Sequence, residues 1–494
     1  MSFEATILGL IVLPLAAGVA VFLARQTAWP LTLAIAVLQL VSAFQLAGIV
    51  STDGPLRYEV GGWGAPLGID LYADGLSALM LLMTAIVGSA VSVYATAYFG
   101  SHESGEKHGH DQHLFWPLNL FLWAALNALF LSGDVFNLYV TLELLTLAAV
   151  ALIGLAGTVE ALAAALRYLL IAVAASLFYL LGVAMLYSVY GTVDWNLLGS
   201  QLRSDLPSLC AIALITVGLL LKTALFPLHF WLPAAHANAP APASALLSAL
   251  VLKASFFMLF RLWFSVFPGA DLRLAGHLLA ALGAAAIVWG SLQAIRQRHL
   301  KLMVAYSTVS QIGYLFLVFS LAAEPTVAWD AWSATAFFAL SHACAKAAVF
   351  MAAGSLQYAT GSGDIDALAG TAQQQPVTVF AFAAAGVVLM GLPPSGAFLA
   401  KWLLLESALL SGQWLLASVV IVGGVLAAVY IFRVVARSLV APEGRATRHV
   451  PLLMQFVPLL LALVSVALGA IGPQAMSLLE VGTPFPPLTT GGVP

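Results

Sequence analysis

The chain has very little charge. Only 8% of its 494 residues are Asp, Glu, Lys or Arg, while 62% are hydrophobic. A soluble globular protein carries about 25% charged residues, so the composition excludes that class and predicts a polytopic membrane protein. The net charge is −3, and the charged residues are spread along the chain without forming a basic patch. We therefore expect no nucleic-acid partner.

Cysteine is equally scarce. Cys210 and Cys344 lie far apart in apolar segments. They cannot supply the thiolates of an iron–sulfur cluster or form a disulfide framework. No motif for flavin, quinone or another cofactor is present, so any electron transfer must occur in another protein.

One loop is rich in histidine. The segment SHESGEKHGHDQH contains His102, His108, His110 and His113. Glycine and charged residues between the imidazoles are typical of a solvated loop, and we expect no metal here.

Apolar runs dominate the rest of the chain. A bilayer-spanning helix needs about 20 apolar residues. Such runs lie at 4–24, 30–50, 73–99, 113–132, 135–156, 161–190, 208–226, 240–266, 275–295, 300–322, 330–357, 376–411, 415–440 and 451–472. The first run lacks the basic start and cleavage site of a signal peptide. The predicted fold is an all-α polytopic membrane protein with about 14 transmembrane helices.

Two of these runs resemble each other. ALRYLLIAVAASLFYLLGVAMLYSVYGTVD ends at Asp194, and ALSHACAKAAVFMAAGSLQYATGSGD ends at Asp364, both with aromatic residues, Gly-Thr or Gly-Ser, and Asp. They occupy the sixth and eleventh runs, and a period of five helices makes successive copies antiparallel. We therefore predict two inverted repeats of five helices. The predicted division is 1–112 for helices 1–3, 113–266 and 275–440 for the repeats, and 451–494 for helix 14 and the tail.

Each predicted repeat contains one broken helix. Pro227 and Pro233 interrupt helix 7, and the segment MGLPPSGAFLAK, residues 390–401, interrupts helix 12. Ordinary proline kinks would explain either break alone. Interrupted helices at corresponding places in two repeats indicate an ion path near the middle of the membrane.

Glu143 is the one acid well inside helix 5, and Lys222 is its expected partner in helix 7. A charged residue in the bilayer needs such a partner or becomes neutral. Protonation of Glu143 would release the ammonium of Lys222, which is the elementary step of a proton relay. A static buried ion pair is the alternative.

Lys253 lies deep in helix 8 with no acid within one helical turn. Such a lysine is expected to be neutral part of the time, which suits a proton carrier; snorkelling to the surface is the alternative. His229 and His236 lie around the break between the two lysines, where imidazoles pass protons near neutral pH. They could equally bind backbone carbonyls freed at the kink.

The second repeat offers a similar series. His342 and Lys346 lie four residues apart on one face of helix 11. Lys401 follows the second break, at the start of a half-helix whose positive end disfavours an ammonium, so it is a plausible last carrier. Glu406 is either its partner or simply the far end of that helix.

Three further charged residues have weaker assignments. Asp134 and Asp74 each precede a helix, where an acid caps the first turn, although both could lie at a pathway mouth. Arg433 in helix 13 takes the repeat position of Lys253 and either ends the helix or helps to form an exit.

These motifs resemble a known family. The stretch from Pro227 to Lys253, RQRHLKLMVAYSTVSQIGY (296–314), HACAK and GLPPSGAFLAKW (391–402) are similar to the antiporter-type proton-conducting subunits of complex I, membrane hydrogenases and Mrp cation/proton antiporters. The segment 56–80, the length and a lysine at position 401 most resemble the D subunit of Mrp antiporters. We expect no long C-terminal extension or lateral helix after helix 14, in contrast to the largest subunits of these complexes.

The resemblance implies roles for individual residues. Glu143 and Lys222 match the family's essential pair, Lys253 its central lysine, and Lys401 its terminal lysine. His342 matches the histidine of helix 11, while Lys346 and His229 fall on motif positions whose roles are less settled.

The expected function is therefore proton translocation within a multisubunit Na⁺ or K⁺/H⁺ antiporter, as a secondary transporter subunit and not as an enzyme. Its expected partners are other subunits of a hetero-oligomeric membrane complex, protons, Na⁺ or K⁺, and lipid. The alternative is a pumping subunit of a redox complex, either complex I or a membrane-bound hydrogenase. A subunit coupled to inorganic-carbon uptake is a third possibility.

Basic residues in the loops predict the orientation. Loops after odd-numbered helices contain Arg25, Lys107, Arg296, Arg298, Lys301, Arg437, Arg445 and Arg448, and the others contain Arg57, Arg203 and Arg273. We expect a bacterial inner membrane protein with cytoplasmic odd loops and both termini on the periplasmic side.

Overall fold

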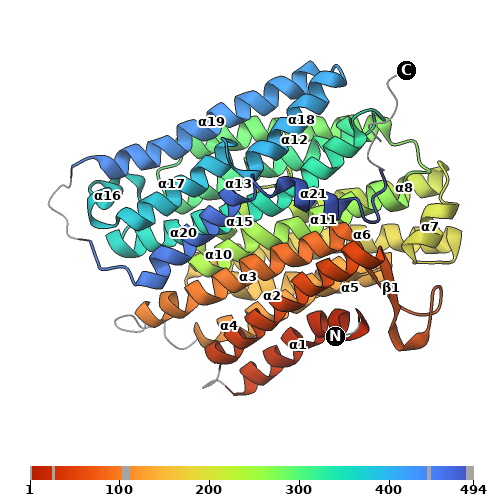
Figure 1. Ribbon diagram of the computed structural model, residues 1–494, viewed down its shortest axis with the longest axis horizontal. Helices are drawn as coiled ribbons and strands as arrows, with labels where there is room; N and C mark the ends of the chain where they lie inside the picture. The colour runs from red at the N-terminus through yellow and green to blue at the C-terminus, as the bar shows by residue number, and fades with distance from the viewer. Residues whose placement is uncertain (1–2, 25–27, 103–111, 442–446, 486–494) are drawn as a thin grey trace.

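The computed structural model describes residues 3–24, 28–102, 112–441 and 447–485. Its elements form an elongated bundle of helices (Figure 1). The N-terminal part contains α1 (Phe3–Leu23), α2 (Ala28–Asp53), β1 (Leu56–Glu59), the 3₁₀ turn η2 (Val60–Gly62), β2 (Asp70–Ala73) and α3 (Gly75–His102).

The central part carries the first predicted repeat. It contains η3 (Gln112–Leu114), α4 (Phe115–Leu131), α5 (Val135–Gly154), α6 (Val159–Tyr190), α7 (Trp195–Gln201), α8 (Leu206–Thr223), α9 (Leu232–Asn238), α10 (Ala241–Leu246), η4 (Leu247–Val251), α11 (Leu252–Arg261) and η5 (Leu262–Val266).

The C-terminal part contains the second predicted repeat and the last helices. Its elements are α12 (Arg273–Arg296), α13 (Leu300–Phe316), α14 (Val318–Leu321), α15 (Ala328–Thr360), η6 (Ile365–Leu368), α16 (Thr371–Gln374), α17 (Pro376–Met390), α18 (Gly396–Leu410), α19 (Trp414–Leu439), α20 (Leu452–Ala467) and α21 (Gly472–Leu479).

The membrane spans agree with the predicted class. Among the described residues, eleven helices are long and apolar enough to cross a bilayer, and the bent pair α20 and α21 makes a twelfth. Two shorter apolar helices, α4 and α17, fall on predicted runs as well. The protein is therefore a multi-pass helical membrane protein, and the total of fourteen spans stays a prediction.

Two spans lie entirely inside the bundle. The hydrophobic windows of α15 and of the span from α10 to η5 are 100% buried, against 39% for α1, α6 and α19. Helices at the periphery cover them on all sides, so their charged side chains cannot face lipid. Lys253, His342 and Lys346 come from these two spans and are buried.

The same backbone contact occurs once within each half, between corresponding elements. The Val135 N–H donates to the Val193 carbonyl, and the Leu300 N–H donates to the Gly363 carbonyl. Asp134 forms an antiparallel bridge with Asp194 in the first half. In the second half, His299 forms one with Asp364.

The two helices of the sequence repeat also end alike. Gly191 ends α6 and Gly361 ends α15, both in the left-handed conformation, with φ of 67° and 69°. The next α-helices along the chain, α7 after α6 and α16 after α15, lie at opposite ends of the bundle (Figure 1). The arrangement agrees with inverted repeats, whose full boundaries remain a prediction.

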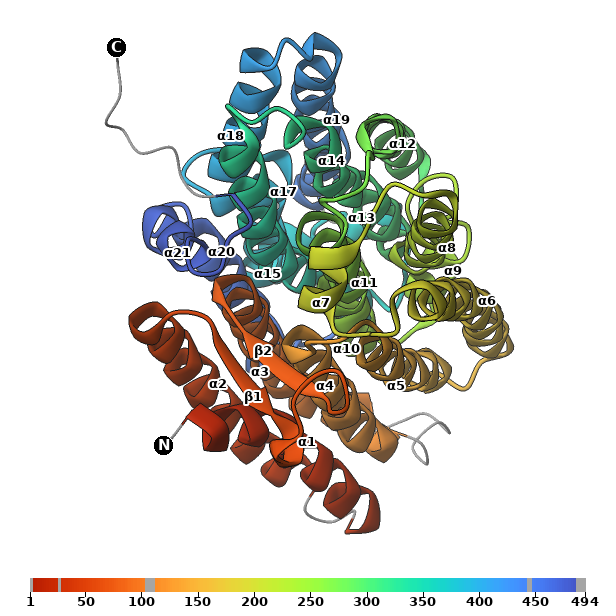
Figure 2. The same cartoon turned by 90° about the vertical axis from the view of Figure 1, so that its right-hand side faces the viewer.

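A hairpin covers one end of the bundle. β1 and β2 pair antiparallel, with Leu56 opposite Ala73, and Figure 2 shows them beside α7 at the end that faces the viewer. Arg57 of β1 forms ion pairs with Asp70 at 2.8 Å and with Asp194 at 3.2 Å. Burial raises the pKa of Asp70 against the opposing effect of Arg57.

A buried ion pair joins α3 to α11 near the same end. The Arg261 guanidinium donates to both carboxylate oxygens of Asp74, at 2.5 and 2.7 Å, and lies 4.9 Å from the centre of the Trp195 ring. Asp74 also accepts the Ser77 N–H, as the predicted capping role requires. Local sequence patterns did not reveal this partner, because 187 residues separate Arg261 from Asp74.

Candidate functional site

The predicted pair in the first half is present. Nζ of Lys222 lies 2.7 Å from Oε1 of Glu143 and 2.9 Å from the Thr146 hydroxyl. Ser176 of α6 donates a hydrogen bond to the same carboxylate. The Lys222 side chain is 4% exposed and that of Glu143 is 24% exposed, so the acid forms the more accessible side of the pair.

The break in helix 7 positions Lys222. α8 ends one residue after this lysine, and Ala224 follows in the left-handed conformation with φ of 56°. A cation in the last turn of a helix is stabilised by the unpaired carbonyls there. The Trp231 indole fixes the next turn, because its Nε1 donates to the Leu221 carbonyl and its ring stacks 4.3 Å from Tyr168.

Lys253 lies at the centre of the bundle and is 1% exposed. Its Nζ donates to the Ser248 carbonyl at 2.5 Å, within the π-helical turn η4 that precedes α11. In the described part of the chain it forms no ion pair. Because π-helical turns are frequent at functional sites and free a carbonyl for such a bond, η4 explains how a lysine is held here without an acid.

Two histidines have no hydrogen-bond partner on either ring nitrogen within the described residues: His236 and His342. Both are 0% exposed. His236 stacks on Phe350 at 4.9 Å, and His342 on Phe338 at 5.4 Å. The expected alternative, in which the imidazole binds carbonyls freed at the kink, is therefore wrong for His236.

His229 is more peripheral and stacks on Phe226 with a centroid distance of 5.6 Å. Its Nδ1 is also without a partner among the described residues. Nδ1 of His229 therefore does not form the alternative hydrogen bond to a backbone carbonyl freed at the kink.

Buried lysines lie within electrostatic range of both imidazoles. His342 lies within electrostatic range of Lys253, Lys346 and Lys401. His236 lies within range of Lys253 and Lys346, and also of Lys301. The predicted site residues of the second half therefore lie near one another around α15. Their separations along the chain did not by themselves predict this proximity.

Lys301 was missed as a site residue, because its charge grouped it with the basic residues of a loop. It lies in the first turn of α13, is 9% exposed and donates to the Ala239 carbonyl at the end of α9. The signal that could have found it is its position inside the apolar run that begins at residue 300.

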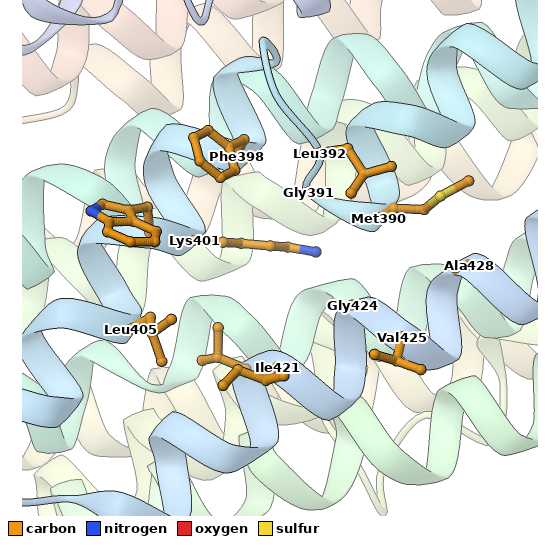
Figure 3. Close-up of a pocket in the computed structure, with 12 residues that line it drawn as sticks. Met390, Gly391, Leu392, Phe398, Lys401, Leu405, Ile421, Gly424, Val425 and Ala428 are labelled. Carbon is orange, nitrogen blue, oxygen red and sulfur yellow. The ribbon is translucent and has the colours of Figure 1, made fainter.

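Lys401 reaches back across the second break. Its Nζ donates to the Leu389 carbonyl at 2.9 Å and lies 4.1 Å from the centre of the Tyr314 ring. Lys401 lies near the start of a half-helix, α18, as predicted. Its ammonium, however, reaches the negative, C-terminal end of α17 and is stabilised there, which the prediction did not include. Figure 3 shows the side chain extending between the Gly391 turn and Gly424 of α19. The cavity there measures about 300 Å³.

Gly391 makes room for this lysine. Its φ is +78°, and a Cβ there would lie 2.7 Å from Cδ of Lys401. We expect Gly391→Ala to cost about 1–2 kcal/mol for the left-handed backbone and also to displace the ammonium, which lowers proton transport. Thermal unfolding and vesicle transport measure the two effects.

Gly412→Ala is the matched control, because Gly412 has φ of +71° and no atom within 4 Å of the added methyl group. It should lose similar stability but keep transport. Equal transport losses in both variants would contradict the positioning role of Gly391.

The remaining predicted residues are structural or peripheral. Asp134 caps α5 by accepting the Asn137 N–H at 2.5 Å. Arg433 donates to the carbonyls of Ile295 and Gln297, at 2.5 and 2.8 Å, and so closes the end of α12. Glu406 is exposed, and no ion pair joins it to Lys401 within the part of the chain that the structure describes.

The histidine-rich loop offers no metal centre that can be described. No group of three or more His, Cys, Asp or Glu side chains within the described ranges is placed to bind a metal ion. His108 and His110 lie outside those ranges, and nothing is placed for the side chain of His102. The expected absence of a metal stays a prediction.

Comparison with known proteins identifies the family to which this sequence belongs. The family described as "NADH:quinone oxidoreductase/Mrp antiporter, TM" matches residues 132–427, and "NADH-Ubiquinone oxidoreductase (complex I), chain 5 N-terminus" matches residues 63–107. The chain belongs to the NADH:quinone oxidoreductase/Mrp antiporter family. The match covers most of both predicted repeats, including both broken helices.

Individual relatives come from both branches of this family. The N subunit of an NADH-quinone oxidoreductase from Desulforudis audaxviator is 38% identical over 90% of this chain and 89% of its own length. The D subunit of a Na⁺/H⁺ antiporter from Alkalihalophilus pseudofirmus is 30% identical over 78% and 76%. A chain in the Mrp complex from Dietzia sp. superimposes with a TM-score of 0.87, 26% identity and coverage of 97% and 98%. The resemblance to Mrp D subunits and the polytopic fold are thereby confirmed.

Proposed function

We propose that this chain translocates protons as one subunit of a multisubunit Na⁺ or K⁺/H⁺ antiporter, without catalysing a reaction of its own. The observation that carries the proposal is the series of buried cations Lys222, Lys253, Lys346 and Lys401, of which only Lys222 has an acidic partner in the described part of the chain. A buried lysine with a purely structural role is usually paired with an acid that keeps it charged. A proton carrier must instead be able to exist in both protonation states, which a lysine without an acidic partner can do.

The first pair controls entry into the series. While Glu143 is ionised it holds the proton on Lys222, because the two charges lie 2.7 Å apart. When Glu143 takes up a proton from its exposed side, the ammonium loses this stabilisation and releases a proton towards Lys253. Thr223 and Ser255, whose hydroxyls are 3.0 Å apart, connect the C-terminal end of α8, which carries Lys222, to the first turn of α11, which carries Lys253.

The later members pass the proton across the second half. Lys253, His342 and Lys346 form the middle of the relay, and Lys401 is its last station. His229, His236 and Lys301 line the approach from the first broken helix. Asp134, Glu406 and Arg433 are left outside the relay, since their contacts are those of a cap, a surface residue and a helix end.

Other subunits of a membrane complex are the proposed partners, since the similar Dietzia chain comes from such a complex. We place the chain in a bacterial inner membrane. Loops with Arg296 and Arg298 would face the cytoplasm, and the hairpin end with Asp70 and Asp194 would face the periplasm.

A second candidate function rests on the relative at 38% identity, which is named as a subunit of an NADH-quinone oxidoreductase. In that case partner proteins would drive the same relay by electron transfer.

Transport measurements in everted vesicles that contain the whole complex distinguish the antiporter function from the redox-driven function. If Na⁺ or K⁺ dissipates an imposed pH gradient, and Glu143→Gln abolishes this effect while the complex still assembles, the antiporter proposal holds. If neither cation acts but a redox substrate drives proton pumping that Glu143→Gln abolishes, the second function replaces it.

A further inference from the structure

A cavity lined mainly by aromatic rings lies at the same end of the bundle as the hairpin. It measures about 250 Å³ and is enclosed by the turn η5, the start of α12, the end of α14 and the C-terminal segment at Phe485. α7 joins this region to the hairpin. The Trp195 ring of α7 lies 5.1 Å from that of Tyr72 in β2, and a Cβ added to Gly199 of α7 would lie 2.8 Å from the Ser265 carbonyl oxygen of η5. The residues of the proposed relay are not among the described residues that line this cavity.

The turn η5 supplies one wall of the cavity. It is a π-helical turn over Leu262–Val266, and Trp263 and Phe264 within it line the cavity together with Phe267, the residue that follows. Phe319 of α14 extends this wall, because its ring lies parallel to that of Phe264 with 5.8 Å between the ring centroids. π-helical turns are frequent at functional sites. The rings together form an apolar surface that favours contact with hydrocarbon.

Arg273 adds a positive charge to this apolar cavity. It is the one charged residue among the described residues that line the cavity. Its side chain is exposed, and its guanidinium forms no hydrogen bond or ion pair with another described residue. The acids of the adjoining loops, Asp271 and Glu324, do not line the cavity, and Asp271 contacts only the backbone N–H of Arg273, at 3.5 Å. A free guanidinium beside an apolar cavity favours a ligand that combines an anionic group with hydrocarbon.

The position of Arg273 along α12 places the cavity at the membrane surface. α12 runs from Arg273 to Arg296 over 24 residues. A helix of that length spans about 36 Å, against about 30 Å for the hydrocarbon core of a bilayer. The two arginines therefore lie at the levels of the two layers of lipid headgroups. Just inside the level of Arg273, Leu274 and Leu278 are 84% and 59% exposed and present apolar surface to the lipid.

We propose that this cavity binds one phospholipid with an anionic headgroup, taken from the leaflet at the hairpin end. The lipid phosphate pairs with the Arg273 guanidinium, and part of one acyl chain lies among the aromatic rings. The cavity is smaller than the roughly 300–1,000 Å³ of most small-molecule pockets, so the rest of the lipid remains outside, along Leu274 and Leu278. Lipid binding requires neither cation exchange nor electron transfer, so this inference goes beyond the proposed function and does not depend on it.

A bound lipid would hold together segments that are distant in the sequence. η5 continues the buried span that carries Lys253 and Arg261, Phe319 belongs to α14, and Phe485 lies in the C-terminal segment with its ring 5.4 Å from that of Phe264. A ligand that binds only the folded protein raises its stability. The lipid is therefore expected to stabilise this end of the bundle.

Two other occupants are possible outcomes of a test. Residues 486–494 follow Phe485 and lie outside the described ranges. Their sequence, PPLTTGGVP, contains no acidic side chain that could pair with Arg273, which favours the lipid. A zwitterionic phospholipid, held only through its acyl chains, is the other occupant. It leaves the positive charge of Arg273 without a role in recognition.

The experiment labels the purified complex with phosphatidylglycerol that carries a photoactivatable diazirine in one acyl chain, and maps the labelled peptides by mass spectrometry. We expect labels on the peptides that contain Trp263 and Phe319. Arg273→Gln should lower this labelling about fivefold, because one basic residue near the membrane surface contributes an attraction of that order. Arg203→Gln is the matched control, since Arg203 is also exposed and follows α7 at the same end, and it should be labelled like the wild type. Added phosphatidylglycerol should also raise the unfolding temperature of the wild type more than that of Arg273→Gln.

Ala323→Trp tests the cavity itself, because it fills the space and leaves Arg273 in place. Labelling of both peptides should be lost, and labelling at the wild-type level overturns the proposal. If Ala323→Trp does not assemble, the exposed residue Arg273 still decides: undiminished labelling in Arg273→Gln, or equal labelling by a phosphatidylcholine analogue, overturns the anionic lipid. Labelling that appears only after deletion of residues 486–494 makes that segment the occupant and overturns it as well.

Discussion

Replacing Lys253 by methionine is expected to abolish proton movement by the complex while leaving its assembly intact. Methionine has nearly the length of the lysine stem and packs well in irregular apolar surroundings, so the site, which is 1% exposed, loses its charge without a large cavity. The relay loses one of the two lysines, Lys253 and Lys346, that lie within electrostatic range of both His236 and His342. Vesicle transport, normalised to assembled complex, measures the loss.

Met258→Leu is a suitable control for this variant. Met258 belongs to the same helix, α11, and is 0% exposed, but it carries no proton. Transport by the control should remain near wild type. Substantial proton movement in an assembled Lys253→Met complex would remove Lys253 from the relay and leave the Ser248 carbonyl contact as a purely structural bond.

Replacing Arg261 by methionine is expected to give the largest loss of stability. Asp74 is 1% exposed and would be left buried without the guanidinium that now donates to both of its oxygens. Removal of one partner of a buried ion pair typically costs about 3–5 kcal/mol. Thermal unfolding of the purified complex and the yield of assembled complex should both fall.

The double variant Arg261→Met with Asp74→Asn should recover much of this stability, because an amide at position 74 needs no counter-ion and can still accept the Ser77 N–H. If the double variant is no more stable than Arg261→Met, the cost arises from lost contacts of the guanidinium with Trp195 and Phe257 and not from an uncompensated charge.

The pair formed by Glu143 and Lys222 shows how far residue patterns reach. Glu143 in the fifth apolar run and Lys222 in the seventh had few other ways to avoid isolation in hydrocarbon. The pairing could be predicted from that scarcity alone, and the structure confirms it at 2.7 Å. The breaks after Thr223 and Met390 were equally predictable, since proline and glycine interrupt helices wherever they occur in such clusters.

The contacts of two other lysines, Lys301 and Lys401, were harder to predict. Lys301 looked like one basic loop residue among several, yet its position in the first turn of α13 turns it towards the Ala239 carbonyl. Lys401 lies near the start of α18, as predicted, but its four-carbon side chain reaches across the break to the Leu389 carbonyl, which the sequence did not indicate. Local sequence does not encode which way a flexible side chain turns.

Composition and periodicity were sufficient for the class of protein, the apolar runs, the paired breaks and most of the ionisable residues inside them. These properties depend on near neighbours in the chain and on the high cost of charge in hydrocarbon. The contact of Arg261 with Asp74, the stacking of Phe338 on His342 and the hydrogen bond from Lys401 to the Leu389 carbonyl required the packed bundle. Each depends on the relative rotation and placement of helices, which side-chain packing across the whole core sets and no short stretch of sequence specifies.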